Sequence, residues 1–361
     1  MSVSTITLRA GDALPPELRR DWVGLRESSP QNSSPYFHPA YTEAVATVSP
    51  EPVSVIVDDS GALMTVQGGA TARPMGAPMS DYHGVVGAYP GGAAGLLRAA
   101  GKATFTAGGL IEPGADTPLL QVPVCRIDLS GGVGEWTASR DKSYRRHAKS
   151  HRRRVRKATE DMGEPRVDWR SRNVDDFNTL VALKRAQYAA SGKYDVLGSW
   201  PGQLIRNLWE RGGDGVWAEL HILRFGNRFA AADLGLTDGT TFHSWIVAYD
   251  PELASYGPGI QLLEALVQAS PGLGYTTIDL GMGLDGYKRH YTNVDANVGV
   301  GVLRLGGARA DLSRLYGRME SRLEPLARLR RRYAQVAACE PRFSGRAKAM
   351  GEAVLASGRN G

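Results

Sequence analysis

Three side chains that can move protons lie close together near the C-terminal end of this sequence. Asp279 ends a predicted strand beside two glycines, and Tyr287 and Lys288 follow on a predicted short helix. General acid–base chemistry needs one group that takes a proton and one that gives it, and these residue types supply both. The alternative is structural and carries equal weight: Asp279 caps the turn and pairs with Lys288.

Two further titratable side chains lie on neighbouring predicted strands. Asp233 belongs to a strand over residues 228–236 and His243 to a strand over residues 240–249. Because side chains alternate between the two faces of a strand, parity decides whether each points to a cleft or to the core. Both are candidate bases, although a single His in an apolar strand is more often a hydrogen-bonded structural residue.

A glycine-rich turn separates the strand over residues 240–249 from a helix over residues 260–269. Such a turn presents free backbone N–H groups at the positive end of the helix, where a phosphate or diphosphate binds well. The sequence therefore predicts a site for a phosphorylated cofactor, and an ordinary strand-to-helix turn is the alternative. The predicted cofactor-binding residues are Tyr256, Gly257, Gly259, Ile260 and Gln261.

A second glycine pattern, Gly281 to Gly286, fits G-x-G-x-x-G and follows a strand. A dinucleotide site of this type needs a long helix after the glycines and an acidic residue about twenty positions on. The sequence has neither, so we interpret the pattern as a tight turn or as a close approach of the backbone to a ligand.

Positive charge is concentrated in two segments of a chain whose net charge is +6. Residues 140–157 hold ten Lys or Arg and one Asp, and residues 304–332 hold nine Arg and three acids. The first segment lies on a long helix predicted over residues 135–162, where Arg145 and Arg152 are candidate phosphate contacts. Nucleic acid is disfavoured because Tyr144 is the single aromatic residue interleaved with these cations.

A turn-rich stretch in the first half supplies another candidate. Asp81, Tyr82 and His83 lie on a loop that could hold a sugar or peptide acceptor, since polar residues on positioned loops often bind ligands. A turn-stabilising Asp is the alternative.

The order of predicted elements in the second half is β-α-α-β-β-β-α-β-α-β, and the first half resembles a degenerate copy of it. The second-half elements before the glycine turn are predicted over residues 165–170, 174–190, 200–211, 216–224, 228–236 and 240–249. After it come 260–269, 276–280, a short helix and 297–305. The first-half elements are predicted over residues 5–8, 16–26, 39–48, 53–58, 62–67, 91–100, 102–107 and 120–129.

The 361 residues are enough for two domains with full cores. We predict a degenerate N-terminal domain over residues 1–133, a linking Arg-rich helix over 134–163, a C-terminal domain over 164–306 and a basic helical tail over 307–361. The tail helix runs over about residues 308–338 with a kink at Pro325, and it is a candidate for peripheral contact with the inner membrane.

The two cysteines, Cys125 and Cys339, match no metal or redox spacing, so we expect no metal and a reduced, cytoplasmic setting. The N-terminus has neither a basic start nor a long apolar run, which predicts that there is no signal peptide. Nor does any window approach eighteen consecutive apolar residues, so no membrane span is expected.

Several of these pieces, in this order and spacing, resemble one family. The pieces are Ser34-Pro35-Tyr36-Phe37-His38-Pro39, Gly76-Ala77-Pro78-Met79-Ser80-Asp81-Tyr82, Lys184-Arg185-Ala186-Gln187-Tyr188, Ala248-Tyr249-Asp250-Pro251 with Gly257-Pro258-Gly259, and Asp279-Leu280-Gly281-Met282-Gly283 with Tyr287-Lys288-Arg289. Over residues 30–305 the chain resembles the CelD-like GNAT acyltransferases linked to bacterial cellulose and exopolysaccharide synthesis. Fem-type transferases are similar in their doubled architecture.

The resemblance implies an α/β (α+β) fold of two GNAT-like domains with mixed central sheets, joined by a long basic helix. It also implies an enzyme that transfers an acyl group, acetyl above all, from acyl-CoA to an amine or hydroxyl of a sugar or lipid-linked sugar. One departure stands out, because GNAT enzymes usually carry an Arg in the diphosphate loop and the loop from Ser255 to Ile260 has none.

Two other functions remain open at this point. A Fem-type transferase would use aminoacyl-tRNA, which the paired halves and the basic helix suit. A non-catalytic regulator of polysaccharide secretion would hold cyclic di-GMP through its arginines, although no phosphate-binding motif of known spacing supports it.

Overall fold

The structure of this chain is a computed structural model. It describes residues 2–112, 119–213, 215–306, 333, 335–340, 344–347 and 350–351. The chain divides into two compact units, each assembled from segments that are separated in sequence. The first unit comprises Met1–Val122, Gly192–Arg206 and Asn297–Gly361, and the second comprises Pro123–Ser191 and Asn207–Ala296. The predicted tail helix and its kink at Pro325 fall almost entirely outside the described residues.

The first unit contains a mixed sheet. Its strand order is β1-β2-β3-β4-β5-β12, in which only the β4–β5 pair is parallel. The strands are β1 (Val3–Leu8), β2 (Val53–Asp58), β3 (Leu63–Gly68), β4 (Thr71–Pro74), β5 (Thr104–Leu110) and β12 (Asn297–Arg304), and the helices are α1 (Pro16–Glu27), α2 (Pro39–Val48) and α3 (Gly92–Ala99). Leu96 and Leu97 of α3 are fully buried in one cluster with Phe105 and Leu303, which joins β5 to the late strand β12.

The second unit contains a sheet with the order β6-β11-β10-β9-β8-β7, in which only the β10–β11 pair is parallel. The strands are β6 (Leu120–Asp128), β7 (Pro165–Asp168), β8 (Trp217–Phe225), β9 (Arg228–Thr237), β10 (Thr241–Tyr249) and β11 (Thr277–Met282). The helices are α4 (Gly132–Ala138), α5 (Lys142–Met162), α6 (Val174–Ala190), α8 (Pro258–Leu273) and α9 (Lys288–Tyr291), and α7 (Trp200–Arg211) crosses the boundary between the units along the chain.

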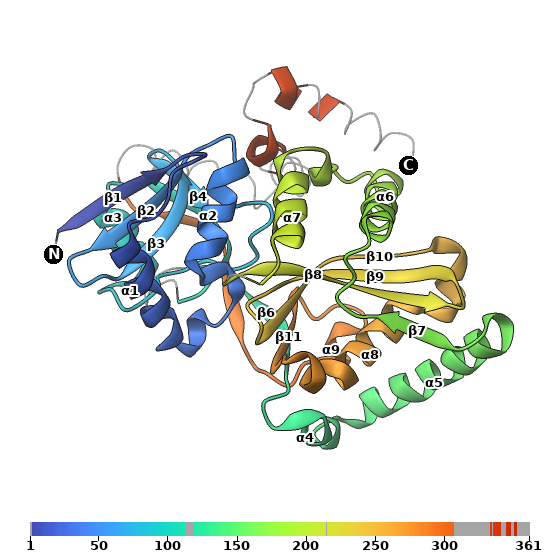
Figure 1. The fold of residues 1–361 in the computed structure, drawn as a ribbon. Coiled ribbons are helices and arrows are strands. Elements are labelled where there is room, and N and C mark those ends of the chain that lie inside the picture. Colours follow the sequence, from blue (N-terminus) through green and yellow to red (C-terminus); the bar gives the residue numbers. More distant parts are fainter. Residues whose placement is uncertain are drawn as a thin grey trace, which may run out of the picture. The chain divides into compact units, whose positions relative to one another are not determined.

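Helices cover both faces of the second sheet, with α6 on one side and α8 on the other (Figure 1). Apolar residues of α8 recur at helical spacing, so one stripe of the helix is buried. In that stripe Leu263, Leu266 and Val267 pack in one cluster with Phe242 and Ile278 of the sheet. The two helices therefore both pack against β10, one of the two strands that position the candidate site.

Two strands pair in a way that chain order does not reveal. β6 precedes the long basic helix but pairs antiparallel with β11 of the second unit, with Asp279 opposite Arg126. Conversely β12, the last strand, pairs with β5 of the first unit. Each sheet is thus completed by a strand from a distant part of the chain.

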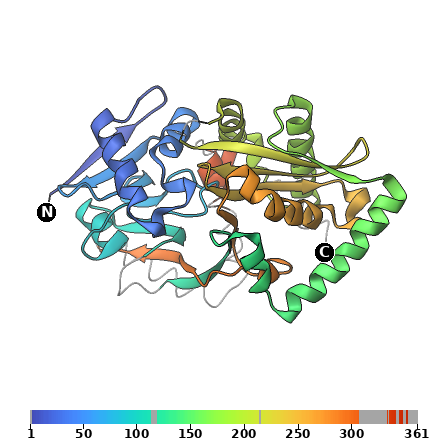
Figure 2. The same ribbon diagram turned by 60° about the horizontal axis from the view of Figure 1, so that its bottom comes forward.

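The prediction of one continuous helix over residues 135–162 is wrong, because two helices, α4 and α5, occupy that stretch. α4 ends at Ala138, and Asp141 then starts α5 as its N-cap, accepting a 2.7 Å hydrogen bond from the backbone N–H of Tyr144. An Asp at this position satisfies one of the unpaired donors of the first turn and so favours a new helix. Figure 2 shows α5 running along the outer edge of the second unit.

Candidate active site

The strands β10 and β11 part soon after they meet. Their parallel pairing within the described residues covers three positions and ends at the pair His243–Asp279. Just beyond it, β10 shifts register against β9 between Ser244 and Ile246, which leaves Trp245 as an extra residue. Such a bulge bends a strand and disrupts the local hydrogen-bond ladder. The two strands therefore part at this point, which we call the opening, next to the candidate catalytic residues His243 and Asp279.

Asp233 is the most chemically distinctive residue of this region. It is 5% exposed, and its Oδ2 accepts a 2.7 Å hydrogen bond from the Ser244 hydroxyl. The other carboxylate oxygen is buried and has no hydrogen-bond partner among the described residues. Burial raises the pKa of Asp233 to about 7, although Ser244, His243 and Lys184 each oppose the shift. A carboxyl with a free acceptor atom and a near-neutral pKa is well suited to act as a general base.

Lys184 of α6 is the residue that our sequence reasoning left without a role. Its Nζ donates a 3.0 Å hydrogen bond to the carbonyl oxygen of Val247, the residue opposite Asp233 on β10, and its charge favours the ionised form of Asp233. The only sequence signal was its place in the Lys184–Tyr188 segment of the family resemblance.

Asp279 and His243, both predicted as catalytic, lie side by side in the core. His243 Nδ1 is 3.4 Å from Asp279 Oδ1, and each side chain is 1% exposed. Asp279 also accepts from Arg126 Nε at 3.2 Å and from the backbone N–H of Gly281 at 2.7 Å. Despite its burial, these partners lower the pKa of Asp279 to about 2. It therefore stays ionised at neutral pH and is suited to orient His243 rather than to exchange protons.

The structural alternative for Asp279 is partly right. Asp279 does cap the turn at Gly281, but its cationic partner is Arg126 of β6, because Lys288 instead donates a 3.2 Å hydrogen bond to the carbonyl of Met282. Tyr287 is 38% exposed. The pKa of Tyr287 is raised to about 12, mainly by burial and further by the charge of Asp233. Tyr287 thus keeps its proton at neutral pH and can donate it.

We predict that Arg126→Gln lowers the free energy of unfolding by about 1 kcal/mol at pH 7. The pKa of Asp279 is depressed in the folded state, so its contribution is present above the unfolded value of about 3.8 and is lost as pH falls toward 2. The loss should therefore shrink at pH 3. Urea unfolding at both pH values measures it. Arg166→Gln, which removes a 64%-exposed guanidinium paired with Asp168, is the matched control and should change little at either pH.

The glycine turn before α8 offers fewer backbone donors than the sequence suggested. The N–H of Gly257 donates to Ala254, and the N–H groups of Ile260 and Gln261 both donate to the carbonyl of Gly257. The Gln261 side chain donates to the carbonyl of Tyr256. Of the predicted glycine donors, Gly259 is the one whose N–H is not used in these turn hydrogen bonds of the described chain.

A guanidinium from another helix lies beside this turn, which has no arginine of its own. Gly257 has a φ of 66°, and a Cβ added there would lie 3.1 Å from Nη1 of Arg154 on α5. Lys157 of the same helix has its Nζ 5.5 Å from the centre of the Tyr256 ring. Two cations of α5 therefore flank the positive end of α8, although neither was predicted to contact this turn.

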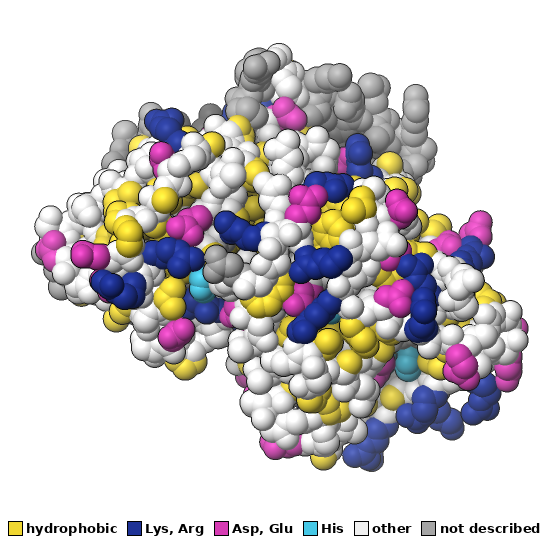
Figure 3. All heavy atoms as spheres, viewed as in Figure 1, with side chains coloured by type: hydrophobic (Ala, Val, Ile, Leu, Met, Phe, Trp, Pro, Cys, Tyr) yellow, Lys and Arg dark blue, Asp and Glu magenta, His cyan; other side chains and the backbone are white. Residues whose placement is uncertain are grey.

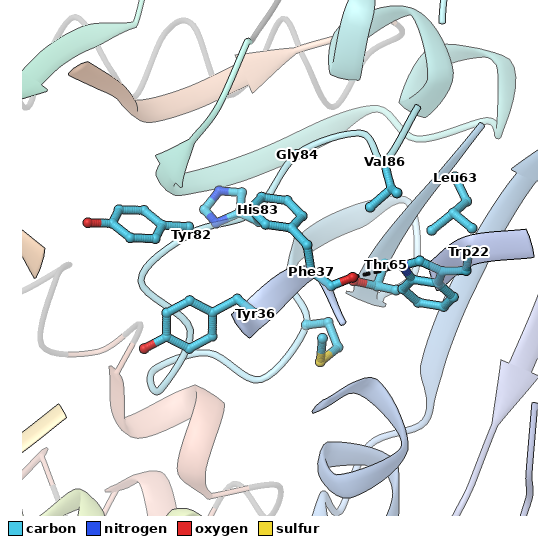
Figure 4. Close-up of a pocket in the computed structure, with 10 residues that line it drawn as sticks. Trp22, Tyr36, Phe37, Leu63, Thr65, Tyr82, His83, Gly84 and Val86 are labelled. Atoms are coloured by element: carbon cyan, nitrogen blue, oxygen red, sulfur yellow. Dashed lines mark hydrogen bonds between the residues drawn. The ribbon is translucent and has the colours of Figure 1, made fainter. Parts of the chain in front are cut away.

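The predicted acceptor loop in the first unit is mostly closed. Tyr82 is 2% exposed and His83 is 6% exposed, and both line a cavity of about 10 Å³, room for about one water molecule. Figure 4 shows His83 beside Phe37, with Trp22 farther along the same cavity. Burial lowers the pKa of His83 to about 3, so this histidine stays neutral. Of the three residues, Asp81 alone is appreciably exposed.

The predicted phosphate contacts Arg145 and Arg152 both lie exposed on α5. Arg152 is close enough to Glu264 of α8 to lower the pKa of that carboxyl, although burial raises it more. Among the described residues, no group of three or more His, Cys, Asp or Glu side chains is arranged to hold a metal ion.

Residues 145–289 match the family described as acetyltransferase (GNAT) domain. FemX is similar in structure, with a TM-score of 0.50 at 12% identity over 86% of this chain and 99% of FemX. The C-terminal domain of a putative lysylphosphatidylglycerol synthetase from Agrobacterium fabrum gives 0.49 at 11% identity over 84% and 96% of the two chains. A tandem GNAT protein of the clavulanic acid pathway gives 0.43 at 12% identity over 85% and 100%. No curated protein matches the sequence.

The family match and the likeness to FemX confirm the predicted fold class, an α/β chain with the GNAT fold. The match of residues 145–289 to the acetyltransferase (GNAT) domain confirms the prediction of an enzyme of the acyltransferase type. The narrower resemblance to CelD-like proteins stays a prediction.

Proposed function

We propose that this chain, which carries a GNAT acetyltransferase domain, transfers an acyl group from acyl-CoA to an amine or hydroxyl of a polysaccharide precursor. Acetyl is the expected acyl group. The observation that carries the proposal is the buried carboxyl of Asp233, with an unused oxygen and a near-neutral pKa, beside the point where β10 and β11 part.

Two parts of the second unit would hold one molecule of the acyl-CoA donor. Its thioester would enter the opening beyond the pair His243–Asp279, where backbone groups of β10 no longer pair with β11. Such groups can donate to the thioester carbonyl, whose oxygen gains negative charge during attack. The diphosphate would lie at the start of α8, with the N–H of Gly259 and the guanidinium of Arg154 as donors.

The reaction would be a direct transfer with two proton movements. The nitrogen or oxygen of the acceptor bonds to the thioester carbon, and Asp233 takes the proton that this atom loses. The carbon–sulfur bond then breaks, and the departing thiolate takes a proton from Tyr287. Cys125 is an unsuitable nucleophile, because burial raises the pKa of its thiol to about 12 and its sulfur donates to the carbonyl of Lys288.

Acetyl-CoA at 1 mM should raise the melting temperature of the protein by a few degrees, because a ligand that binds only the folded state stabilises it. Calorimetric titration then gives the affinity, and cyclic di-GMP serves as the comparison ligand for the regulator hypothesis. The absence of any shift with acetyl-CoA, or binding of cyclic di-GMP alone, would count against the proposal. A mass-spectrometric screen of nucleotide-sugars and lipid-linked sugars identifies the acceptor.

A Fem-type reaction with aminoacyl-tRNA is the second candidate, and the similarity in fold to FemX is the observation that favours it. Its donor would also be an activated acyl group, so the same base would serve. Dependence of the transfer on RNA separates the two: ribonuclease treatment should leave an acyl-CoA-dependent activity unchanged and abolish a tRNA-dependent one.

Among the described residues, no helix is both long and apolar enough to cross a membrane. We propose a cytoplasmic site of action, in which any contact with the inner membrane is peripheral.

A further inference from the structure

The outer side of α5 carries a line of cations that the candidate active site does not use. Their spacing of four, three, four and three residues places them on one side of the helix, and all five are exposed. We call this set the cationic stripe; it consists of Lys142, Arg146, Lys149, Arg153 and Arg156. Figure 3 shows Lys and Arg side chains gathered where α5 forms the lower right edge of the molecule.

The cationic stripe has no role in holding α5 in place. The helix is anchored by its opposite side, where Tyr144, Ala148 and Ala158 are buried against neighbouring elements. Within the described part of the chain, no member of the cationic stripe forms an ion pair or a side-chain hydrogen bond. Like charges three and four residues apart destabilise a helix. Because folding gains nothing from this arrangement, an external anion is the natural partner.

The length and composition of this surface favour an extended plane of phosphates over a nucleic acid. α5 has 21 residues, so the surface extends for about 30 Å. A widely open hollow of about 640 Å³ runs along α5. It is lined by Ser150, by Arg152 and by four members of the cationic stripe, and by no aromatic side chain. Readers of single-stranded nucleic acid use aromatic residues for stacking, and the deep groove of an RNA duplex excludes side chains. A plane of phosphates contacts the whole edge at once.

We propose that the cationic stripe docks α5 on an anionic phospholipid surface. The contact is electrostatic, because the lining of the hollow carries no aliphatic or aromatic side chain that would insert between lipids. Arginine makes paired hydrogen bonds to lipid phosphates, and three of the five cations are arginines. The inference does not depend on the proposed reaction, since it concerns a surface that contains none of the catalytic candidates.

The test is sedimentation of the full chain with vesicles of phosphatidylcholine alone or with 30% phosphatidylglycerol. The stripe variant is Arg146→Gln/Lys149→Gln/Arg153→Gln/Arg156→Gln. The control variant removes four other exposed cations, Arg9→Gln/Arg20→Gln/Arg185→Gln/Arg211→Gln, and so has the same net charge. The melting temperature of each variant is measured alongside, and the stripe variant should melt no lower than the wild type because like-charge repulsion is relieved.

Wild type should bind only the anionic vesicles, and binding should weaken steeply between 50 and 300 mM salt. The stripe variant should bind roughly a hundredfold less tightly, and the control variant less than about threefold. Equal losses in the two variants, or no wild-type binding to anionic vesicles, overturn the proposal. Tighter binding to a tRNA mixture than to the vesicles, lost in the stripe variant, overturns it in favour of RNA. Titration of acetyl-CoA into the stripe variant tests the reaction separately, since donor binding should be unchanged.

Discussion

Asp233→Asn is expected to lower the rate constant of acyl transfer by about 10²–10⁴-fold and, at pH 8, to stabilise the fold. The amide keeps the contact with Ser244 but cannot accept a proton from the acceptor. In wild type, the rate should fall as pH drops below about 7, the pKa of the buried carboxyl. That acidic limb should be absent from whatever activity the variant retains.

The stability effect has a definite sign. The unfolded carboxyl ionises near pH 3.8, whereas the folded one keeps its proton up to about pH 7. The free energy of unfolding of the wild type therefore falls as pH rises from about 3.8 to about 7. The variant has no such cost and should gain up to about 4 kcal/mol at pH 8 and little at pH 4. Urea unfolding at the two pH values measures the gain. A variant that keeps its activity, or that is equally destabilised at both pH values, would contradict the assignment.

Gly257→Val should weaken acetyl-CoA binding by at least about tenfold. The residue has a φ of 66°, which a β-branched side chain adopts only at a cost of roughly 1–3 kcal/mol. Its Cβ would also approach the Arg154 guanidinium to 3.1 Å, displacing the cation proposed to hold the diphosphate. Calorimetric titration of acetyl-CoA gives the change in affinity.

Gly274→Val is the matched control for this substitution. Gly274 ends the same helix with a φ of 86° and therefore suffers a similar backbone strain, but it lies far from the proposed diphosphate site along α8. Both variants should lose thermal stability, and only Gly257→Val should lose donor affinity. Equal affinities for acetyl-CoA in the two variants would place the diphosphate elsewhere.

Local patterns predicted most of the fold because the elements have clear periodicity and clear ends. The expected helix over residues 174–190 coincides with α6, and the one starting after Ser199 coincides with α7. The break at Asp141 was missed, although an Asp is one of the residues favoured as an N-cap before a helix. The pairing of β6 with β11 was also missed, because strand pairing at such separation leaves no mark in a single sequence.

The candidate site was predictable in composition but not in arrangement. The sequence indicated Asp233 and His243 on neighbouring strands and Asp279 as a separate candidate, and the structure places Asp279 beside His243 at the end of the β10–β11 pairing. The sequence pattern did not indicate Arg126 or Arg154, because both reach the site from segments that are far away along the chain. Tyr82 and His83 illustrate the reverse case, in which polar residues on a predicted loop turn out to be core residues.

The central claim is that the donor's acyl group lies between the parted strands, next to Asp233. Photo-crosslinking with an acyl-CoA analogue that carries a diazirine in its acyl group tests this claim without knowledge of the acceptor. Peptide mapping should place the label on β9 or β10, and an excess of acetyl-CoA should prevent it. A label that forms on the first unit, or that persists with excess acetyl-CoA, would contradict the account.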